Sequence, residues 1–291
     1  MCLAAFACGL SDRFPFVLLA NRDEGFERAA APMAWWSGRC IEPREPNLLT
    51  GRDLSAGGTW LGLTASGRVA LVTNVREPGR VVAGSPSRGE LVPQWLQSEH
   101  PVHDAAALLA LGEVARNGFN LLVADLASMG SAHARSDSAR WFSNRPQLQQ
   151  RSLGPGVHGV SNAALDTPWP KLVRLKQRLQ HMLGDGHDLA GLQAAGFAAL
   201  ADPQCADDAE LPSTGLPLLR ERQLSPAFIR IVGGDPELAI YGTRCATLVV
   251  LQNHGSRRSV HVVERSFGPS GSVIGEVSHE WDLPSAFTPR Q

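Results

Sequence analysis

The apolar positions at the start of the chain fall into two short runs separated by a polar turn. Residues 3–8 and 14–20 are apolar, and Leu10-Ser11-Asp12-Arg13 lies between them. This pattern predicts a β-hairpin that folds residue 2 back beside residues near 20. After Asn21 the pattern becomes irregular, and prolines interrupt it as far as Arg52.

Further along the chain, the apolar pattern predicts more hairpins. A second hairpin is expected over residues 59–64 and 69–75, around Ala65-Ser66-Gly67. A strand is expected over residues 119–126, with a hairpin over 132–142. Two long strands over 239–251 and 259–266 are expected near the end of the chain.

Helical periodicity occupies separate segments. Residues 93–111 are expected to form two short helices divided at Pro101. A longer helix is expected to begin at residues 166–168, with Thr167 as its cap and Pro168 in its first turn. Its apolar face comprises Leu172, Leu175, Leu179 and Leu183. Another helix is expected over 188–200, followed by a proline-rich and acidic surface excursion over 202–225.

Because strands come in hairpins and helices in separate runs, the predicted fold class is α+β with antiparallel sheet. No repeat or low-complexity tract divides the chain. A single domain over residues 1–291 is therefore expected.

The overall charge argues against nucleic acid and anionic membrane surfaces as partners. The 291 residues carry 27 basic and 28 acidic side chains, a net charge of −1. No apolar run approaches the roughly 18–20 residues of a membrane span, and the start lacks the basic region of a secretory signal. Five cysteines without C-x-x-C spacing suggest a reducing compartment. We therefore expect a cytoplasmic protein with a small-molecule or acylated ligand, its oligomeric state left open.

Several common chemical signatures are absent. The chain has no P-loop, no G-x-S-x-G and no H-E-x-x-H. The segment 154–159 matches G-x-G-x-x-G, but the pattern predicts no helix at its third glycine, which argues against dinucleotide binding. Residues 99–104 include possible metal ligands, but Pro101 prevents a shared helical face. No metal site is expected.

Cys2 is the residue whose position suggests catalysis. If Met1 is removed, Cys2 carries both a nucleophilic thiol and a base, its own α-amine. The predicted hairpin brings Arg22 and Asp23 near it, and a guanidinium favours the thiolate. Because strand neighbours face opposite sides, both reach Cys2 only if the chain bends, which Gly25 would help. The alternatives are an inert buried thiol and a charged strand end exposed to water.

Seven sequence blocks in order carry a family resemblance. They are Asn21-Arg22-Asp23-Glu24 after Met1-Cys2, Gly57-Gly58-Thr59-Trp60-Leu61-Gly62, Thr73-Asn74-Val75-Arg76, Ser87-Arg88-Gly89-Glu90-Leu91-Val92, Phe119-Asn120-Leu121-Leu122, His158-Gly159-Val160-Ser161-Asn162-Ala163 with Trp169-Pro170-Lys171, and Tyr241-Gly242-Thr243-Arg244-Cys245-Ala246-Thr247. With these blocks the chain resembles the NRDE-motif family, also called the transport and Golgi organization family. That family is similar to the N-terminal nucleophile hydrolases, which implies a four-layer αββα sandwich.

The resemblance also implies roles for individual residues. By likeness to the choloylglycine-hydrolase branch, Cys2 is the nucleophile, Arg22 steadies its thiolate and Asp23 holds the amine. Asn74 or Asn162 donates to the oxyanion, and Arg244 completes the polar floor. In that branch the arginine and aspartate are not adjacent, so Glu24 is an alternative for the acid. Structural hydrogen bonds at strand ends are the alternative for Asn74, Asn162 and Arg244.

Two functions follow from the resemblance. The first is an amidohydrolase or acyl-transfer activity on a C–N bond of a partly apolar substrate, with no cofactor. The second is a non-catalytic carrier of haem or an acyl lipid in the same cleft, with His158 as a haem ligand. The seven tryptophans either line an apolar cleft wall or belong to the core.

Overall fold

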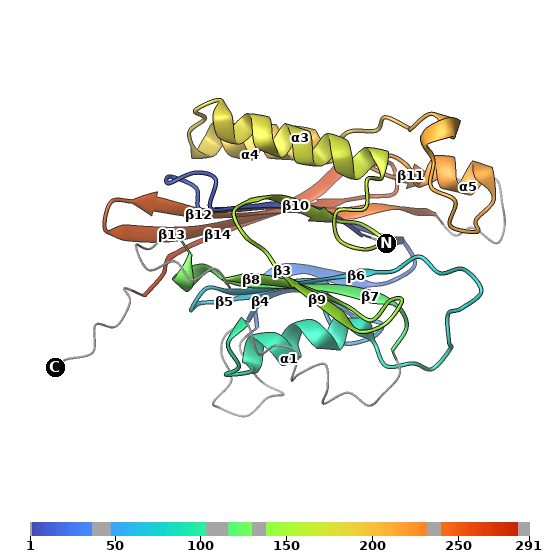
Figure 1. Ribbon diagram of the computed structural model, residues 1–291, viewed down its shortest axis with the longest axis horizontal. Helices are drawn as coiled ribbons and strands as arrows, with labels where there is room; N and C mark the ends of the chain where they lie inside the picture. The colour runs from blue at the N-terminus through green and yellow to red at the C-terminus, as the bar shows by residue number, and fades with distance from the viewer. Residues whose placement is uncertain (1, 37–47, 103–115, 130–137, 232–239, 285–291) are drawn as a thin grey trace.

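Two antiparallel sheets are stacked face to face, and helices cover both outer faces (Figure 1). The computed structural model describes residues 2–36, 48–102, 116–129, 138–231 and 240–284. This arrangement is the predicted four-layer αββα sandwich. None of the helices in these segments is long and apolar enough to cross a membrane.

The first sheet, sheet A, contains both the N-terminal hairpin and the long C-terminal strands. Within the described segments its strands are, in spatial order, β10 (Gly156–Val160), β1 (Cys2–Cys8), β2 (Phe16–Gly25), β12 (Tyr241–His254), β13 (Arg257–Phe267) and β14 (Val273–Asp282), with β11 (Arg230–Ile231) also paired to β12. The predicted first hairpin is confirmed, because Cys2 lies opposite Arg22 and Phe6 lies opposite Leu18.

The second sheet, sheet B, is built from the middle of the chain. Its described strands are, in spatial order, β3 (Ala30–Trp36), β4 (Leu48–Asp53), β5 (Leu61–Thr64), β6 (Arg68–Asn74), β7 (Phe119–Asp125), β8 (Ala139–Ser143) and β9 (Gln149–Ser152). The predicted second hairpin corresponds to β5 and β6, which pair around residues 65–67.

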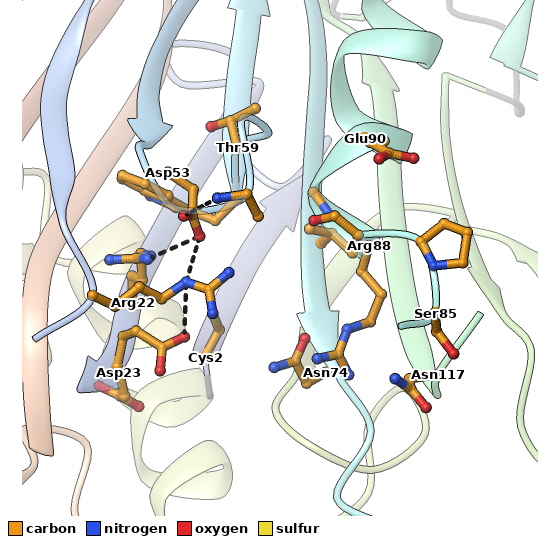
Figure 2. Close-up of a pocket in the computed structure, with 18 residues that line it drawn as sticks. Cys2, Arg22, Asp23, Asp53, Thr59, Asn74, Ser85, Arg88, Glu90 and Asn117 are labelled. Carbon is orange, nitrogen blue, oxygen red and sulfur yellow. Dashed lines mark hydrogen bonds and ion pairs between the residues drawn. The ribbon is translucent and has the colours of Figure 1, made fainter. Parts of the chain in front are cut away.

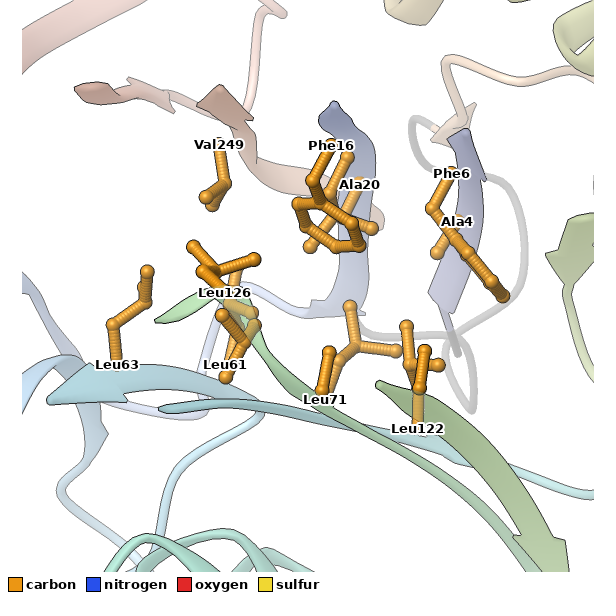
Figure 3. Close-up of a cluster of buried hydrophobic side chains, with 14 of the residues drawn as sticks. Ala4, Phe6, Phe16, Ala20, Leu61, Leu63, Leu71, Leu122, Leu126 and Val249 are labelled. Atoms are coloured by element: carbon orange, nitrogen blue, oxygen red, sulfur yellow. The ribbon is translucent and has the colours of Figure 1, made fainter. Parts of the chain in front are cut away.

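The main core lies between the sheets. Ala4, Phe6, Phe16 and Ala20 project from sheet A toward Leu61, Leu63, Leu71 and Leu122 of sheet B (Figure 3). The intervening residues of β1 and β2, such as Leu3 and Leu19, pack on the opposite face against helices. Because both faces of these strands are covered, the sequence shows a continuous apolar run instead of an alternating pattern.

The helices on sheet A are α3 (Pro170–Gly184) and α4 (Leu189–Leu200). Leu172, Leu175 and Leu179 are buried as predicted, whereas Leu183 is half-buried. The predicted start was wrong: the N-cap is Trp169, and Pro170 occupies the first turn. Thr167 donates instead to the carbonyl of Ala164, because its hydroxyl bonds a local turn that precedes the helix.

The outer face of sheet B is covered by α1 (Leu91–Gln97), which buries Trp95 and Leu96. The second short helix expected after Pro101 falls mostly in residues 103–115, outside the described segments. The same holds for residues 132–137, the first part of the third predicted hairpin, whose second part forms β8.

Several elements were not predicted from the sequence. The irregular stretch from Asn21 to Arg52 contains the end of β2 together with β3 and β4, and the expected surface excursion contains α5 (Leu218–Gln223). The strands β9, β10 and β14 were also missed. The residues of β9 and β14 are largely exposed, so the apolar pattern that marks a buried strand is missing there.

Candidate functional site

Cys2 is the first residue of β1 and faces the space between the two sheets. It lines a cavity of about 450 Å³ whose walls come from both sheets (Figure 2). The polar lining residues are Cys2, Arg22, Asp23, Glu24, Arg28, Asp53, Thr59, Asn74, Ser85, Ser87, Arg88, Glu90 and Asn117. The predicted hairpin therefore places Cys2 at a polar cavity, not within an apolar core.

Arg22 lies beside Cys2 on the neighbouring strand and is only 5% exposed. Its Nη2 atom lies 3.5 Å from a carboxylate oxygen of Asp53, and its guanidinium stacks 4.3 Å above the ring of Trp60. Its Nη1 atom is buried and has no hydrogen-bond partner within the described segments. Arg22 is thus a buried cation with one donor atom left without a partner.

Asp23 reaches the same cavity from the helix-covered face of sheet A. Thr243 donates a hydrogen bond of 2.7 Å to its carboxylate. The strand β2 continues through Gly25, but its pairing with β12 shifts by one residue. Asp23 is paired with Thr243 and Arg22 with Cys245, so Arg244 has no partner residue in β2 and forms a β-bulge. There is no break in β2 before Gly25, where the bend was expected, and the register irregularity lies in the partner strand.

Burial and neighbouring charges act on both ionisable groups. Burial raises the pKa of the Cys2 thiol, Asp23 raises it further and Arg22 lowers it. Burial also raises the pKa of Asp23, while Lys171 and the Thr243 hydrogen bond lower it. A cation near each group therefore offsets part of the cost of burying its charge.

Lys171 was not predicted as a site residue. It is 2% exposed, and its ammonium donates a hydrogen bond of 2.9 Å to the carbonyl of Leu224. Burial lowers its pKa to about 8, although Asp23 opposes the shift. Its position in the Trp169-Pro170-Lys171 block was the only signal in the sequence.

The two predicted asparagines are connected but differ in exposure. Asn74 lines the cavity at the end of β6. Asn162 is 1% exposed, and its side-chain amide donates a hydrogen bond of 2.8 Å to the carbonyl of Asn74. Asn74 is thus the cavity-facing candidate, and Asn162 holds its backbone.

Arg244 and His158 do not line the Cys2 cavity. The Arg244 guanidinium donates to the carbonyls of Gly25 and Arg28, at 2.8 and 2.9 Å, and lines a second cavity. His158 lies opposite Phe6, four residues from Cys2 along β1, roughly 13 Å at the usual strand rise. Its two ring nitrogens lie 3.4 Å from Asp166 and 3.0 Å from the Gly154 carbonyl, so the site does not fit an axial haem ligand.

Glu24, the alternative acid, faces the cavity next to Arg28. Its carboxylate accepts from the Gly25 amide and lies 3.9 Å from the Arg28 guanidinium. Arg28 in turn donates to Asp53 at 2.7 Å. Glu24 therefore belongs to a network of ion pairs that also contains Arg22.

Most described tryptophans belong to the core. Trp60 lines the Cys2 cavity, whereas Trp95, Trp141 and Trp169 are buried in hydrophobic clusters. Trp35 packs edge-to-face against Trp281 with ring centroids 5.2 Å apart. Among the described residues, Trp60 is the one tryptophan that lines the Cys2 cavity, so the tryptophans do not form an aromatic wall there.

A second cavity of about 270 Å³ adjoins the first and shares Arg22 and Trp60 with it. Its lining is more apolar and includes Ala30, Pro32, Phe267, Ile274 and Val277. Within the described segments, no group of three or more His, Cys, Asp or Glu side chains is placed to hold a metal ion.

Comparison with known proteins gives a consistent family match. The sequence model described as "Transport and Golgi organisation 2" matches residues 1–269. A Transport and Golgi organization protein 2 homolog from Bos taurus is 31% identical over 283 residues, covering 94% of each chain. The homologs from Mus musculus and Homo sapiens are 29% and 28% identical, each covering 83% of this chain and 84% of the relative.

Solved structures with a similar arrangement are more distant. A C2A mutant of conjugated bile acid hydrolase from Clostridium perfringens has a TM-score of 0.47 at 8% identity, covering 99% of both chains. The Caenorhabditis elegans ortholog of N-acylethanolamine-hydrolyzing acid amidase has a TM-score of 0.44 at 8% identity, covering 66% of this chain and 84% of that one. Similarity at this level says nothing about activity.

Proposed function

The chain belongs to the Transport and Golgi organisation 2 family, and we propose that it is an N-terminal-cysteine amidohydrolase or acyl-transfer enzyme. The observation that carries the proposal is the position of Cys2 in a polar cavity beside the buried Arg22. Removal of Met1 would give Cys2 the free amine that this chemistry needs.

In the proposed reaction the α-amine takes the proton of the Cys2 thiol, and the sulfur attacks the amide carbon. The carbonyl oxygen then carries the negative charge, toward which Asn74 donates, while Asn162 holds the Asn74 backbone. Loss of one such donor costs about 3–4 kcal/mol in other enzymes. The C–N bond breaks as the leaving amine takes the proton from the ammonium. Water, or another acyl acceptor, then displaces sulfur from the thioester and releases the acyl product.

The neighbouring charges support this sequence of steps. Burial raises the pKa of the Cys2 thiol, and the charge of Arg22 offsets part of that rise, which favours the attacking thiolate. In this proposal Asp23 holds the ammonium that forms, and the positive charge of Lys171 favours the ionised form of Asp23. An apolar portion of the substrate would occupy the second cavity, which adjoins the first at Arg22 and Trp60.

The test is amide cleavage by the purified protein. We expect Cys2→Ala to reduce turnover to background, because the nucleophile is lost. Cys8→Ala, on the same face of β1 but buried in the core, should keep turnover. Intact mass should show that Met1 is removed. Retention of Met1 in an active protein, or full turnover by Cys2→Ala, would refute the mechanism.

The alternative is a non-catalytic acyl-lipid carrier, for which the apolar lining of the second cavity is the supporting observation. A carrier would bind its ligand equally well in the Cys2→Ala variant and would release it unchanged. Haem is less well supported, because both ring nitrogens of His158 have partners and charged side chains line the Cys2 cavity.

A further inference from the structure

The charged groups around the Cys2 cavity are matched by opposite charges, with one exception. Arg22 and Arg28 face Asp53 and Glu24, and Glu90 is 3.1 Å from Arg116. Asp23 has Lys171 as an opposing charge. Arg88 makes no ion pair with any residue in the described segments, although it lines the cavity.

The contacts of Arg88 leave a defined part of its guanidinium available. Its Nη1 atom donates to the carbonyl of Gly118, 3.2 Å away, just before β7. Since Asn74 lies opposite Phe119, this contact fixes the guanidinium beside Asn74, on the sheet B side of the cavity (Figure 2). Its Nε and Nη2 atoms have no hydrogen-bond partner within the described segments. These two atoms lie on the same edge of the guanidinium, the edge with which an arginine binds a carboxylate through two parallel hydrogen bonds.

The backbone that carries Arg88 is also held firmly. Gly89 accepts a hydrogen bond of 3.1 Å from the Thr59 amide, and a Cβ atom on Gly89 would lie 2.9 Å from the Thr59 carbonyl oxygen. The two segments are therefore in direct backbone contact, which fixes the start of the Arg88 side chain relative to the cavity.

We propose that Arg88 binds a carboxylate on the substrate, so that the preferred substrates are amides carrying a single negative charge. This inference rests on the proposed function of Cys2 and adds the substrate class. A monoanion is favoured over a phosphate dianion because Glu24, Asp53 and Glu90 also line the cavity and would repel a second negative charge.

The test uses alkylation of Cys2, which needs no turnover. Rates with anionic iodoacetate and neutral iodoacetamide are measured by peptide mass spectrometry, with the exposed Cys205 as an internal reference. We expect Arg88→Gln to lower the iodoacetate-to-iodoacetamide ratio at Cys2 about tenfold, as loss of a charged hydrogen bond implies. Arg257→Gln, which removes an exposed arginine paired with Asp282 at the far end of β13, should leave the ratio within about twofold. An unchanged ratio in Arg88→Gln, or an equal fall in Arg257→Gln, would overturn the proposal.

A second measurement uses the unaltered protein, so it does not depend on the folding of a variant. N-acetylglycine should protect Cys2 from iodoacetamide at lower concentration than N-acetylglycinamide, which lacks the carboxylate. Equal protection by the two, or equal protection by inorganic phosphate, would overturn the assignment to a carboxylate. If selectivity for the carboxylate is found but no amide is cleaved, the proposed function fails while the Arg88 site stands.

Discussion

Asn21 and Arg22 are adjacent in sequence but act on opposite faces of sheet A. The Asn21 amide donates to the carbonyls of Leu200 and Ala227, both at 2.9 Å, and so connects the sheet to the helical layer. Arg22 points to the cavity. Asp23 then points toward the helical layer and Glu24 toward the cavity, as expected for alternating residues of a strand. The four-residue motif therefore combines a structural contact with cavity-facing groups, and only Asn21 lies wholly outside the cavity lining.

Lys171 gives a prediction at the same scale. Its folded pKa is about 8, below the ordinary value of 10.5. Between these values the unfolded chain binds more protons than the folded one, so stability rises with pH. We expect the free energy of unfolding of the wild type, relative to that of Lys171→Met, to rise by about 1.5 kcal/mol between pH 8 and 9.5, as measured by urea unfolding. If the difference in free energy of unfolding between the two proteins stays constant over this pH range, the pKa of Lys171 is not lowered in the folded protein.

At the scale of elements, the sequence blocks 57–62 and 87–92 form one contact. A Cβ atom on Gly58 would lie 2.6 Å from the Gly89 carbonyl carbon. Trp60 follows in the same segment, and it fits because Gly51 has no side chain: a Cβ atom there would lie 2.3 Å from the Trp60 ring. Glycines from three segments thus let Arg88 and Trp60 approach the cavity.

Gly58→Ala tests this contact. The added methyl group meets backbone atoms of Gly89, so it should displace the Arg88 segment and lower the carboxylate selectivity of Cys2 alkylation as well as the melting temperature. Gly184→Ala is the matched control, because a Cβ atom there meets nothing within 4 Å and Gly184 lies in α3, away from both cavities. If the selectivity of Gly58→Ala is the same as that of Gly184→Ala and the wild type, the contact does not position Arg88.

At the scale of the molecule, a buried ion pair joins the helical layer to the end of sheet B. Arg76, just after β6, is paired with Glu221 of α5, and their side chains are 6% and 3% exposed. Thr214 also donates to Glu221, and the Arg76 amide donates to the Asn162 carbonyl at 2.8 Å. This pair links the segment around α5 to the strand end that carries Asn74.

Removing one member of this pair should be costly. Glu221→Gln leaves the Arg76 charge buried, and the loss of one partner from such a pair typically costs about 3–5 kcal/mol. We expect a loss of this size in the free energy of unfolding by urea. Asp208→Asn, which breaks the exposed pair with Arg222, should change it little. Equal effects of the two changes would contradict a structural role for the buried pair.

Much of the fold could be predicted because its signals are local. The hairpin of β1 and β2 follows from two apolar runs and a turn, and α3 and α4 follow from helical periodicity. The strands β3, β9 and β14 were missed, because their residues are partly exposed or interrupted by proline and gain their pairing only from neighbouring strands. The strand β4 was missed although its first four residues are buried, because Leu48 and Leu49 are its only apolar side chains. The predicted cap at Thr167 failed because a local turn competes for its hydroxyl.

The sequence by itself determined that Cys2 lies beside Arg22, because a hairpin pairs residues that are close along the chain and strand geometry alternates their side chains. Only the tertiary structure decided what else surrounds them. It brought Asp53, Arg88 and Lys171 to the site and placed Arg244 and His158 outside the Cys2 cavity. These positions depend on how two sheets and their helices pack, and that packing joins segments far apart in sequence.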